Sequence, residues 1–206
     1  MRRSGVVRER VSRAIAAMLV AVAMSHPPTV ADAAPVAATG TVEFAFTPDD
    51  AVDAKIVAAI GAAEHEVLVL AYSFTHPKIA RALKAAFARG VRVEIIADRG
   101  QTFELPQSAV PALARDGVPV WLDGRFGAAH NKVLIVDADG PHPTTITGSY
   151  NFTLAAQKRN AENIAILRDN PEAAAAYRAY FRRRQASAER WSGDDSSPAP
   201  RSRPAR

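Results

Sequence analysis

Short apolar runs alternate with segments of helical periodicity along most of the chain. The runs that predict strands span residues 42–46, 66–74, 91–98, 118–122, 132–137, 144–148 and 162–167. Between them, apolar positions spaced three or four apart predict helices over residues 51–63, 77–88, 109–115 and 171–184. This alternation predicts a single α/β domain with a central mixed or mainly parallel β-sheet flanked by helices.

Residues 1–33 have the composition of a secretory signal peptide. They hold five arginines against two acidic residues, a net charge of +3, and their apolar run of residues 14–24 is shorter than the roughly 20 residues that cross a bilayer. The small-residue triplet Ala31-Asp32-Ala33 follows. We therefore expect cleavage near Ala33 or Ala34 and export to the periplasm or the medium. An uncleaved membrane anchor is the alternative.

The remainder of the chain divides by composition. Residues 34–41 predict a linker, residues 42–191 the domain, and residues 192–206, rich in Ser, Pro, Arg and Asp, a disordered tail. Taking +3 from the net charge of +5 leaves +2, so a nucleic-acid surface has to be a local patch. The chain has no cysteine, which excludes disulfides, thiolate zinc sites and a cysteine nucleophile.

Two short segments concentrate the residues that can do chemistry. HNKVLIVD begins at His130, and GSYN begins at Gly148. Side chains at positions i and i+2 of a strand share a face, so His130 and Lys132 are expected to project together while Asn131 points away. By the same alternation Asp137 falls on the opposite face. Ser149 and Asn151 repeat the spacing and add a hydroxyl and an amide, a set suited to a phosphate ester.

In order, these residues resemble the defining pattern of the phospholipase D superfamily, H-x-K-x4-D followed by G-S-x-x-N or a close variant. The interval between the two halves is longer here, and we place the extra length in a loop over residues 138–143. Residues 67–98 and 148–167 also resemble the small bacterial metal-independent endonucleases of that superfamily. The resemblance covers about residues 42–184, nearly the whole expected mature domain.

The resemblance implies a mechanism and a role for each matching residue. The implied catalytic residues are His130, Lys132, Asp137 and Glu162, and the implied phosphate-binding residues are Lys132, Ser149 and Asn151. His130 would attack phosphorus and form a phosphohistidine, and a second histidine would protonate the leaving oxygen and then activate water. Glu162 would hold the imidazole in the right tautomer, and Asp137 would have a supporting structural role. No metal and no cofactor is required.

The chain carries one such motif, whereas a complete site needs two histidines. The resemblance therefore implies a twofold homodimer with the active site at the interface. His142, in the loop, is the other candidate for the second histidine, but no lysine accompanies it.

The preferred function is that of an exported endonuclease that cleaves DNA, with RNA as a further substrate, with little sequence selectivity. Lys158, Arg159 and Arg125 are candidates to flank the site and contact phosphates. The alternatives are a phospholipase D-type lipid phosphodiesterase and a non-catalytic nucleic-acid-binding protein. No stable membrane association is expected after removal of the leader.

Overall fold

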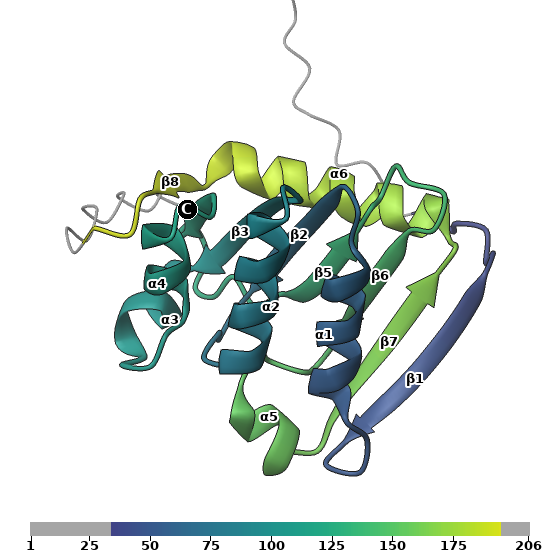
Figure 1. Cartoon of the computed structure of the whole chain (residues 1–206), viewed down its shortest axis with the longest axis horizontal. Helices are drawn as coiled ribbons and strands as arrows, with labels where there is room; N and C mark the ends of the chain where they lie inside the picture. The colour runs from purple at the N-terminus through teal and green to yellow at the C-terminus, as the bar shows by residue number, and fades with distance from the viewer. Residues whose placement is uncertain (1–33, 195–206) are drawn as a thin grey trace, which may run out of the picture. The chain divides into compact units, whose positions relative to one another are not determined.

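One eight-stranded sheet organises the described part of the chain, residues 34–194 of a computed structural model (Figure 1). The expected signal peptide, residues 1–33, and most of the expected tail lie outside the described residues. In sheet order the strands are β1 (Thr41–Thr47), β7 (Glu162–Arg168), β6 (Thr144–Gly148), β5 (Lys132–Val136), β2 (Glu66–Ala71), β3 (Arg92–Asp98), β4 (Val120–Asp123) and β8 (Glu189–Trp191).

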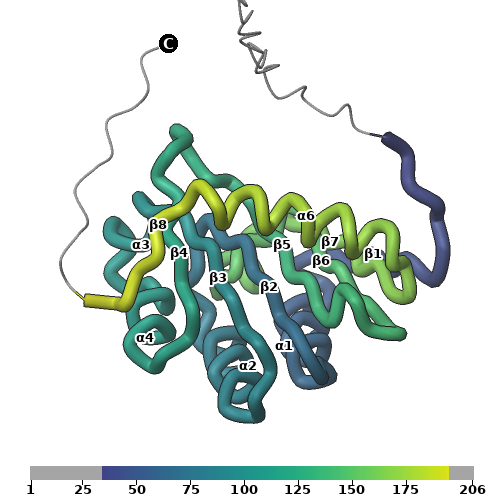
Figure 2. The backbone as a smooth tube through the Cα atoms, turned by 90° about the horizontal axis from the view of Figure 1, so that it is seen from above, coloured from purple at the N-terminus to yellow at the C-terminus, as the bar shows by residue number. Residues whose placement is uncertain are grey.

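The sheet is mixed, as the sequence predicts. Only β2, β3 and β4 run parallel to one another, and every other neighbouring pair is antiparallel. Helix α1 (Val52–Ala62) leads from β1 into β2, α2 (Pro77–Ala88) joins β2 to β3, and α3 (Arg99–Glu104) and α4 (Val110–Arg115) join β3 to β4. Helices α5 (Leu154–Lys158) and α6 (Pro171–Ser187) come later in the chain. Figure 2 shows α6 along one face of the sheet and α1, α2 and α4 on the other.

Helices on both faces explain why the central strands are apolar throughout. All six residues of β2 are buried, since each face of this strand is covered. On the α1 and α2 side, strand residues such as Leu134 and Ile95 pack with Ile79 and Leu83 of α2. On the α6 side, the alternate strand residues pack around Phe181. The sheet thus separates two cores, and successive side chains along a central strand enter one core and then the other.

A buried acid also fixes α6 to the sheet. Glu66, at the start of β2, is only 3% exposed, and its carboxylate pairs with Arg92, Arg178 and Arg182. Arg182 pairs with Glu94 of β3 as well. Because a buried carboxylate without partners would be costly, these guanidinium groups hold α6 in one position across β2 and β3.

The expected elements are present, with three additions and one shortening. Helices α3 and α5, of six and five residues, and strand β8, of three, were not predicted, because segments this short show too little periodicity in a sequence. Both short helices begin at side-chain caps: Asp98 accepts from the Gln101 amide, and Thr153 accepts from the Ala156 amide. The strand expected over residues 66–74 ends at Ala71, and the residues after it leave the sheet.

No helix among residues 34–194 is both long enough and apolar enough to cross a membrane.

Candidate active site

His130 lies just before β5, at the end of the sheet where the parallel strands have their carboxyl ends. Lys132 is the register partner of Ala71, the last residue of β2. The pairing continues one step further, because the Tyr72 amide donates to the Asn131 carbonyl oxygen at 2.9 Å. The His130 ring, which is exposed, packs against the Tyr72 ring with 4.4 Å between centroids. The imidazole is therefore open to solvent and supported from one side.

The expected strand alternation at this edge is confirmed. The Lys132 Nζ lies 4.9 Å from the centroid of the Tyr72 ring, so this one ring contacts both Lys132 and His130. Asn131 points the other way, and its Nδ2 donates to the Tyr180 hydroxyl of α6 at 3.4 Å. The histidine and the lysine thus share a side, and the residue between them faces α6.

Lys132 forms the buried floor of the site. It is 7% exposed, and its Nζ donates to the His130 carbonyl oxygen at 3.1 Å. Burial lowers the pKa of Lys132, while the nearby Glu162 carboxylate opposes that change. A partly desolvated ammonium attracts an anion more strongly than one in water, because the surroundings screen its field less.

Ser149 and Glu162 form a second part of the same site. The Ser149 hydroxyl donates to Glu162 Oε2 at 2.5 Å and accepts from the Asn163 amide at 3.0 Å. The other carboxylate oxygen, Oε1, accepts from Asn160 Nδ2 at 2.9 Å. Both oxygens of Glu162 are therefore engaged, and neither contacts His130 within the chain. Within one chain the His130 ring is supported by Tyr72, and the expected orientation of an imidazole by Glu162 stays a prediction.

Steric crowding explains why the second segment begins with a glycine. Gly148 ends β6 with φ at +155°, and a Cβ at this position would collide with the carbonyl oxygen of Asn163 in β7. The close approach of the two strands places Ser149 within reach of Glu162.

Asn151 lies in a segment that is anchored by its backbone. The Phe152 carbonyl oxygen accepts from the amides of Thr75 and His76 at 2.9 and 2.8 Å, and the Thr153 amide donates to the Asn151 carbonyl oxygen at 2.7 Å. The side-chain Oδ1 of Asn151 is buried and has no hydrogen-bond partner among the described residues. Asn151 is two residues from Ser149, and a buried polar atom without a partner is typical of a position that a ligand completes.

Asp137 does not join this cluster. It follows Val136, at the far end of β5, with a left-handed backbone (φ 47°). Its carboxylate accepts from three backbone amides, those of Glu64 at 2.9 Å, His65 at 2.8 Å and Glu66 at 2.7 Å. The whole of β5 therefore separates Asp137 from His130, in addition to the expected difference in strand face. This position does not fit the grouping of Asp137 with the catalytic residues. Asp137 supports the loop before β2.

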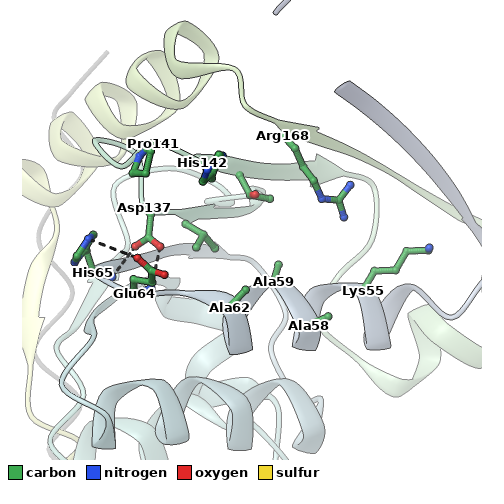
Figure 3. Close-up of a pocket in the computed structure, with 12 residues that line it drawn as sticks. Lys55, Ala58, Ala59, Ala62, Glu64, His65, Asp137, Pro141, His142 and Arg168 are labelled. Atoms are coloured by element: carbon green, nitrogen blue, oxygen red, sulfur yellow. Dashed lines mark hydrogen bonds and ion pairs between the residues drawn. The ribbon is translucent and has the colours of Figure 1, made fainter. Parts of the chain in front are cut away.

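The other described histidines are either at the far end of the sheet or fully buried. His65 and His142 line a pocket of about 500 Å³ at the far end of the sheet, together with Asp137 (Figure 3). His142 pairs there with Asp169 at 3.0 Å. His76 is fully buried, and burial lowers its pKa. Among residues 34–194, no second histidine is therefore placed to serve the reaction at His130.

Two supporting residues were not found from the sequence. Tyr72 was expected inside a strand, and its contact with His130 follows from the β2–β5 register, which no local pattern encodes. Asp98 ends β3, and its Oδ2 accepts from the Ala129 amide at 2.8 Å, which fixes the loop immediately before His130.

An open groove begins next to Tyr72. It is lined by residues after β2, around α3 and at the start of α5: Ser73, Thr75, Pro77, Leu105, Gln107, Thr153, Leu154, Ala155 and Arg159. Of the three basic residues expected to flank the site, Arg159 lines this groove, while Lys158 ends α5 and Arg125 lies in the loop before His130; all three are exposed.

Comparisons with known proteins agree on one family. Residues 56–185 match the family model described as cardiolipin synthase, PLD-like domain. The chain is 40% identical over 146 residues to phospholipase D of Rickettsia conorii, covering 71% of this chain and 70% of that protein. It is 33% identical over 115 residues to mitochondrial cardiolipin hydrolase of Mus musculus, covering 56% of this chain and 50% of that protein. Among solved structures, it is similar to Nuc from Salmonella typhimurium, a phospholipase D family member, with 32% identity and a TM-score of 0.67 over 73% of this chain and 97% of that one.

The position of Asp137 predicts a loss of stability without a change at His130. Asp137→Ala should lower the free energy of unfolding by about 3 kcal/mol, because three amides lose a charged acceptor and alanine tolerates a left-handed backbone poorly. Asp137→Asn should lose less, since its amide oxygen still accepts and asparagine adopts this backbone more readily. Urea unfolding measures both.

The imidazole resonances of His130 provide the control in an NMR titration. They should stay in the wild-type pattern in both variants, because β5 separates the two residues. Resonances that shift in Asp137→Asn while stability is unchanged would contradict the supporting role.

Proposed function

Because the chain belongs to the phospholipase D superfamily, we propose that it is an endonuclease that hydrolyses phosphodiester bonds of DNA, and of RNA as a further substrate. The superfamily makes it a phosphodiesterase. The observation that carries the finer proposal is the exposed His130 imidazole at an open edge of the sheet, beside the buried Lys132 ammonium. An open edge admits a long polymer, which a closed pocket would exclude.

The reaction proceeds in two displacements. An unprotonated nitrogen of His130 forms a bond to phosphorus, the bond from phosphorus to the leaving oxygen breaks, and a second histidine gives that oxygen a proton. Water, deprotonated by the same second histidine, then attacks phosphorus and breaks the phosphohistidine bond. Lys132 and Asn151 stabilise the additional negative charge on the five-coordinate phosphorus, and Ser149 orients a phosphate oxygen. No step requires a metal ion.

We propose that the second histidine comes from a second copy of this chain, in a twofold dimer. Support comes from the positions of His65, His76 and His142, none of which serves His130 within the described residues. The edge strand β1 offers a surface for association. Its residues Val42, Phe44 and Phe46 are 51%, 65% and 56% exposed. Phe46 pairs in register with Asn163, the neighbour of Glu162, so this apolar row ends beside the incomplete site.

Nucleic acid is preferred as the substrate because basic groups flank the site. Arg159 lines the groove beside Tyr72, and Arg125 lies five residues before His130 in an exposed loop. We propose export on the composition of residues 1–33. A lipid phosphodiesterase is the second candidate. It is favoured by the relatives named phospholipase D and cardiolipin hydrolase, and by the apolar side chains of Leu105 and Leu154 in the groove.

Cleavage assays on three substrates distinguish these functions. Purified wild-type protein in excess EDTA should cleave plasmid DNA, and RNA as a further substrate, and leave phosphatidylcholine vesicles intact. His130→Ala should lower the rate on DNA by about a thousandfold or more, because the nucleophile is lost. The control variant His142→Ala should behave like wild type, since His142 lies at the far end of the sheet.

Each other result has a defined meaning. Hydrolysis of the lipid alone would establish the second candidate, and binding of DNA without cleavage would establish a non-catalytic protein. Loss of DNA cleavage on adding EDTA would contradict the metal-free mechanism. Cleavage that survives His130→Ala would contradict the site.

Mixed dimers test whether two chains share one site. Wild-type and His130→Ala chains carrying different affinity tags are co-expressed, and dimers that hold one of each are purified through both tags. Such a dimer has a single His130 and should be nearly inactive on DNA. If each chain worked alone, the mixed dimer would keep half the activity of a doubly tagged wild-type dimer, and the shared site would be wrong.

A further inference from the structure

Three arginines lie over partly or fully exposed aromatic rings on the α6 side of the sheet, apart from Arg182, which lies over the buried Phe181. The Arg183 guanidinium lies 5.8 Å from the centroid of Tyr180. The Arg184 guanidinium lies 4.3 Å from that of Phe126, and the Arg190 guanidinium 4.5 Å from that of Trp121. We call these six residues, with Arg125 next to Phe126, the arginine–aromatic surface. This surface brings planar guanidinium groups and aromatic rings together, whereas an ordinary charged helix face presents cations alone.

The charges on this surface differ from those elsewhere on α6. Arg178 and Arg182 are neutralised by Glu66, Asp139 and Glu94. By contrast, Arg183 and Arg190 are exposed, and no carboxylate within ion-pair distance is found for either among residues 34–194, nor for Arg125. Three cations on this surface are therefore available to an anionic partner.

The arginine–aromatic surface reaches the candidate active site. The Tyr180 hydroxyl accepts from Nδ2 of Asn131, the residue next to His130. Phe126 lies in the exposed loop that ends at His130. Arg184 joins the two parts, because its guanidinium donates to Asp123 at the end of β4 and also packs against the Phe126 ring. Beyond α6 the chain continues into β8, where Arg190 pairs in register with Trp121 of β4 (Figure 2).

We propose that the arginine–aromatic surface binds a single-stranded segment of the nucleic acid whose phosphodiester lies at His130. This inference rests on the proposed nuclease function and names the form of its substrate. A guanidinium beside an aromatic ring can receive an unpaired base by stacking and neutralise a neighbouring phosphate. A duplex hides its base faces, so that it gains only the charge interaction.

The same geometry disfavours a membrane as the partner. Interfacial binding requires apolar side chains that protrude into the lipid. Trp121 and Tyr180 are only partly exposed and have guanidinium groups over their faces, so cations are the outermost groups there. Phe126 is 51% exposed and outside the Arg184 side chain, which is 16% exposed, so one ring of the surface protrudes, whereas interfacial binding uses a set of protruding apolar side chains.

Steady-state cleavage of two substrates tests the proposal. One substrate is a single-stranded oligodeoxynucleotide, and the other is bis(p-nitrophenyl) phosphate, a diester too small to reach beyond the site. Arg183→Ala/Arg190→Ala should lower kcat/KM on the oligonucleotide about tenfold, mainly through KM, because stacking and charge are lost. It should leave hydrolysis of the small diester unchanged. Arg183→Lys/Arg190→Lys keeps the charge but not the flat cation, and should recover only part of the loss.

The matched control removes two positive charges from the opposite face of the sheet. Arg81→Ala/Lys84→Ala acts on exposed residues of α2 and should resemble wild type on both substrates. The duplex form of the oligonucleotide should be affected less than the single strand by Arg183→Ala/Arg190→Ala.

Four outcomes would overturn the proposal. These are unchanged oligonucleotide cleavage by the alanine variant, an equal loss in the α2 control, an equal loss on the small diester, and a change of oligomeric state on light scattering, which would make this surface an interface between copies. If Arg183→Ala/Arg190→Ala cleaved the oligonucleotide normally but lost the binding to anionic vesicles that the wild type shows, the surface would be assigned to a membrane. A wild-type protein that hydrolyses the small diester but no nucleic acid would instead contradict the proposed function.

Discussion

Strand β5 is held in register between β2 and β6, and this pairing determines what the site can contain. Lys132 stands opposite Ala71 because of it, and His130 comes to rest beside Tyr72. Strand side chains alternate between faces, so a slip of one residue would bring Asn131 to the floor of the site and turn Lys132 toward α6. At the other end of β5, Asp137 binds the loop that leads into β2. The motif therefore places His130, the proposed nucleophile, at one end of the strand and a structural anchor at the other.

The electrostatics of the site follow from where the sheet ends. Lys132 is buried at that edge, with its charge opposed by burial and favoured by Glu162. Glu162 is itself satisfied by Ser149 and Asn160. The Glu162 carboxylate thus interacts with both the Lys132 ammonium and the Ser149 hydroxyl, so both groups have defined positions before a phosphate arrives. The Lys132 ammonium is held in place before the reaction, which costs little at the moment of reaction, whereas the Ser149 hydroxyl has one proton and must redirect it from Glu162 to reach a phosphate oxygen.

Local patterns in the sequence predict the long elements and the pairing of His130 with Lys132, because both depend only on periodicity. They do not predict features that depend on contacts between distant segments. The pairing of β8 with β4 and the contact between Tyr72 and His130 are of this kind, whereas helices α3 and α5 begin at local caps and are simply too short to show periodicity. The position of Asp137 was only partly predicted, since alternation gives a face and not the partner at the strand end. The arginine–aromatic surface could not be predicted, because it joins β4, a loop, α6 and β8.

The central claim is that His130 becomes covalently bonded to phosphorus during turnover. It is tested most directly by quenching the protein while it is consuming a DNA oligonucleotide and mapping adducts by peptide mass spectrometry under conditions that preserve phosphohistidine. The expected result is a nucleotide adduct on the peptide that contains His130, which is missing in His130→Ala. An adduct on another residue, or none while substrate is still being consumed, would contradict the claim.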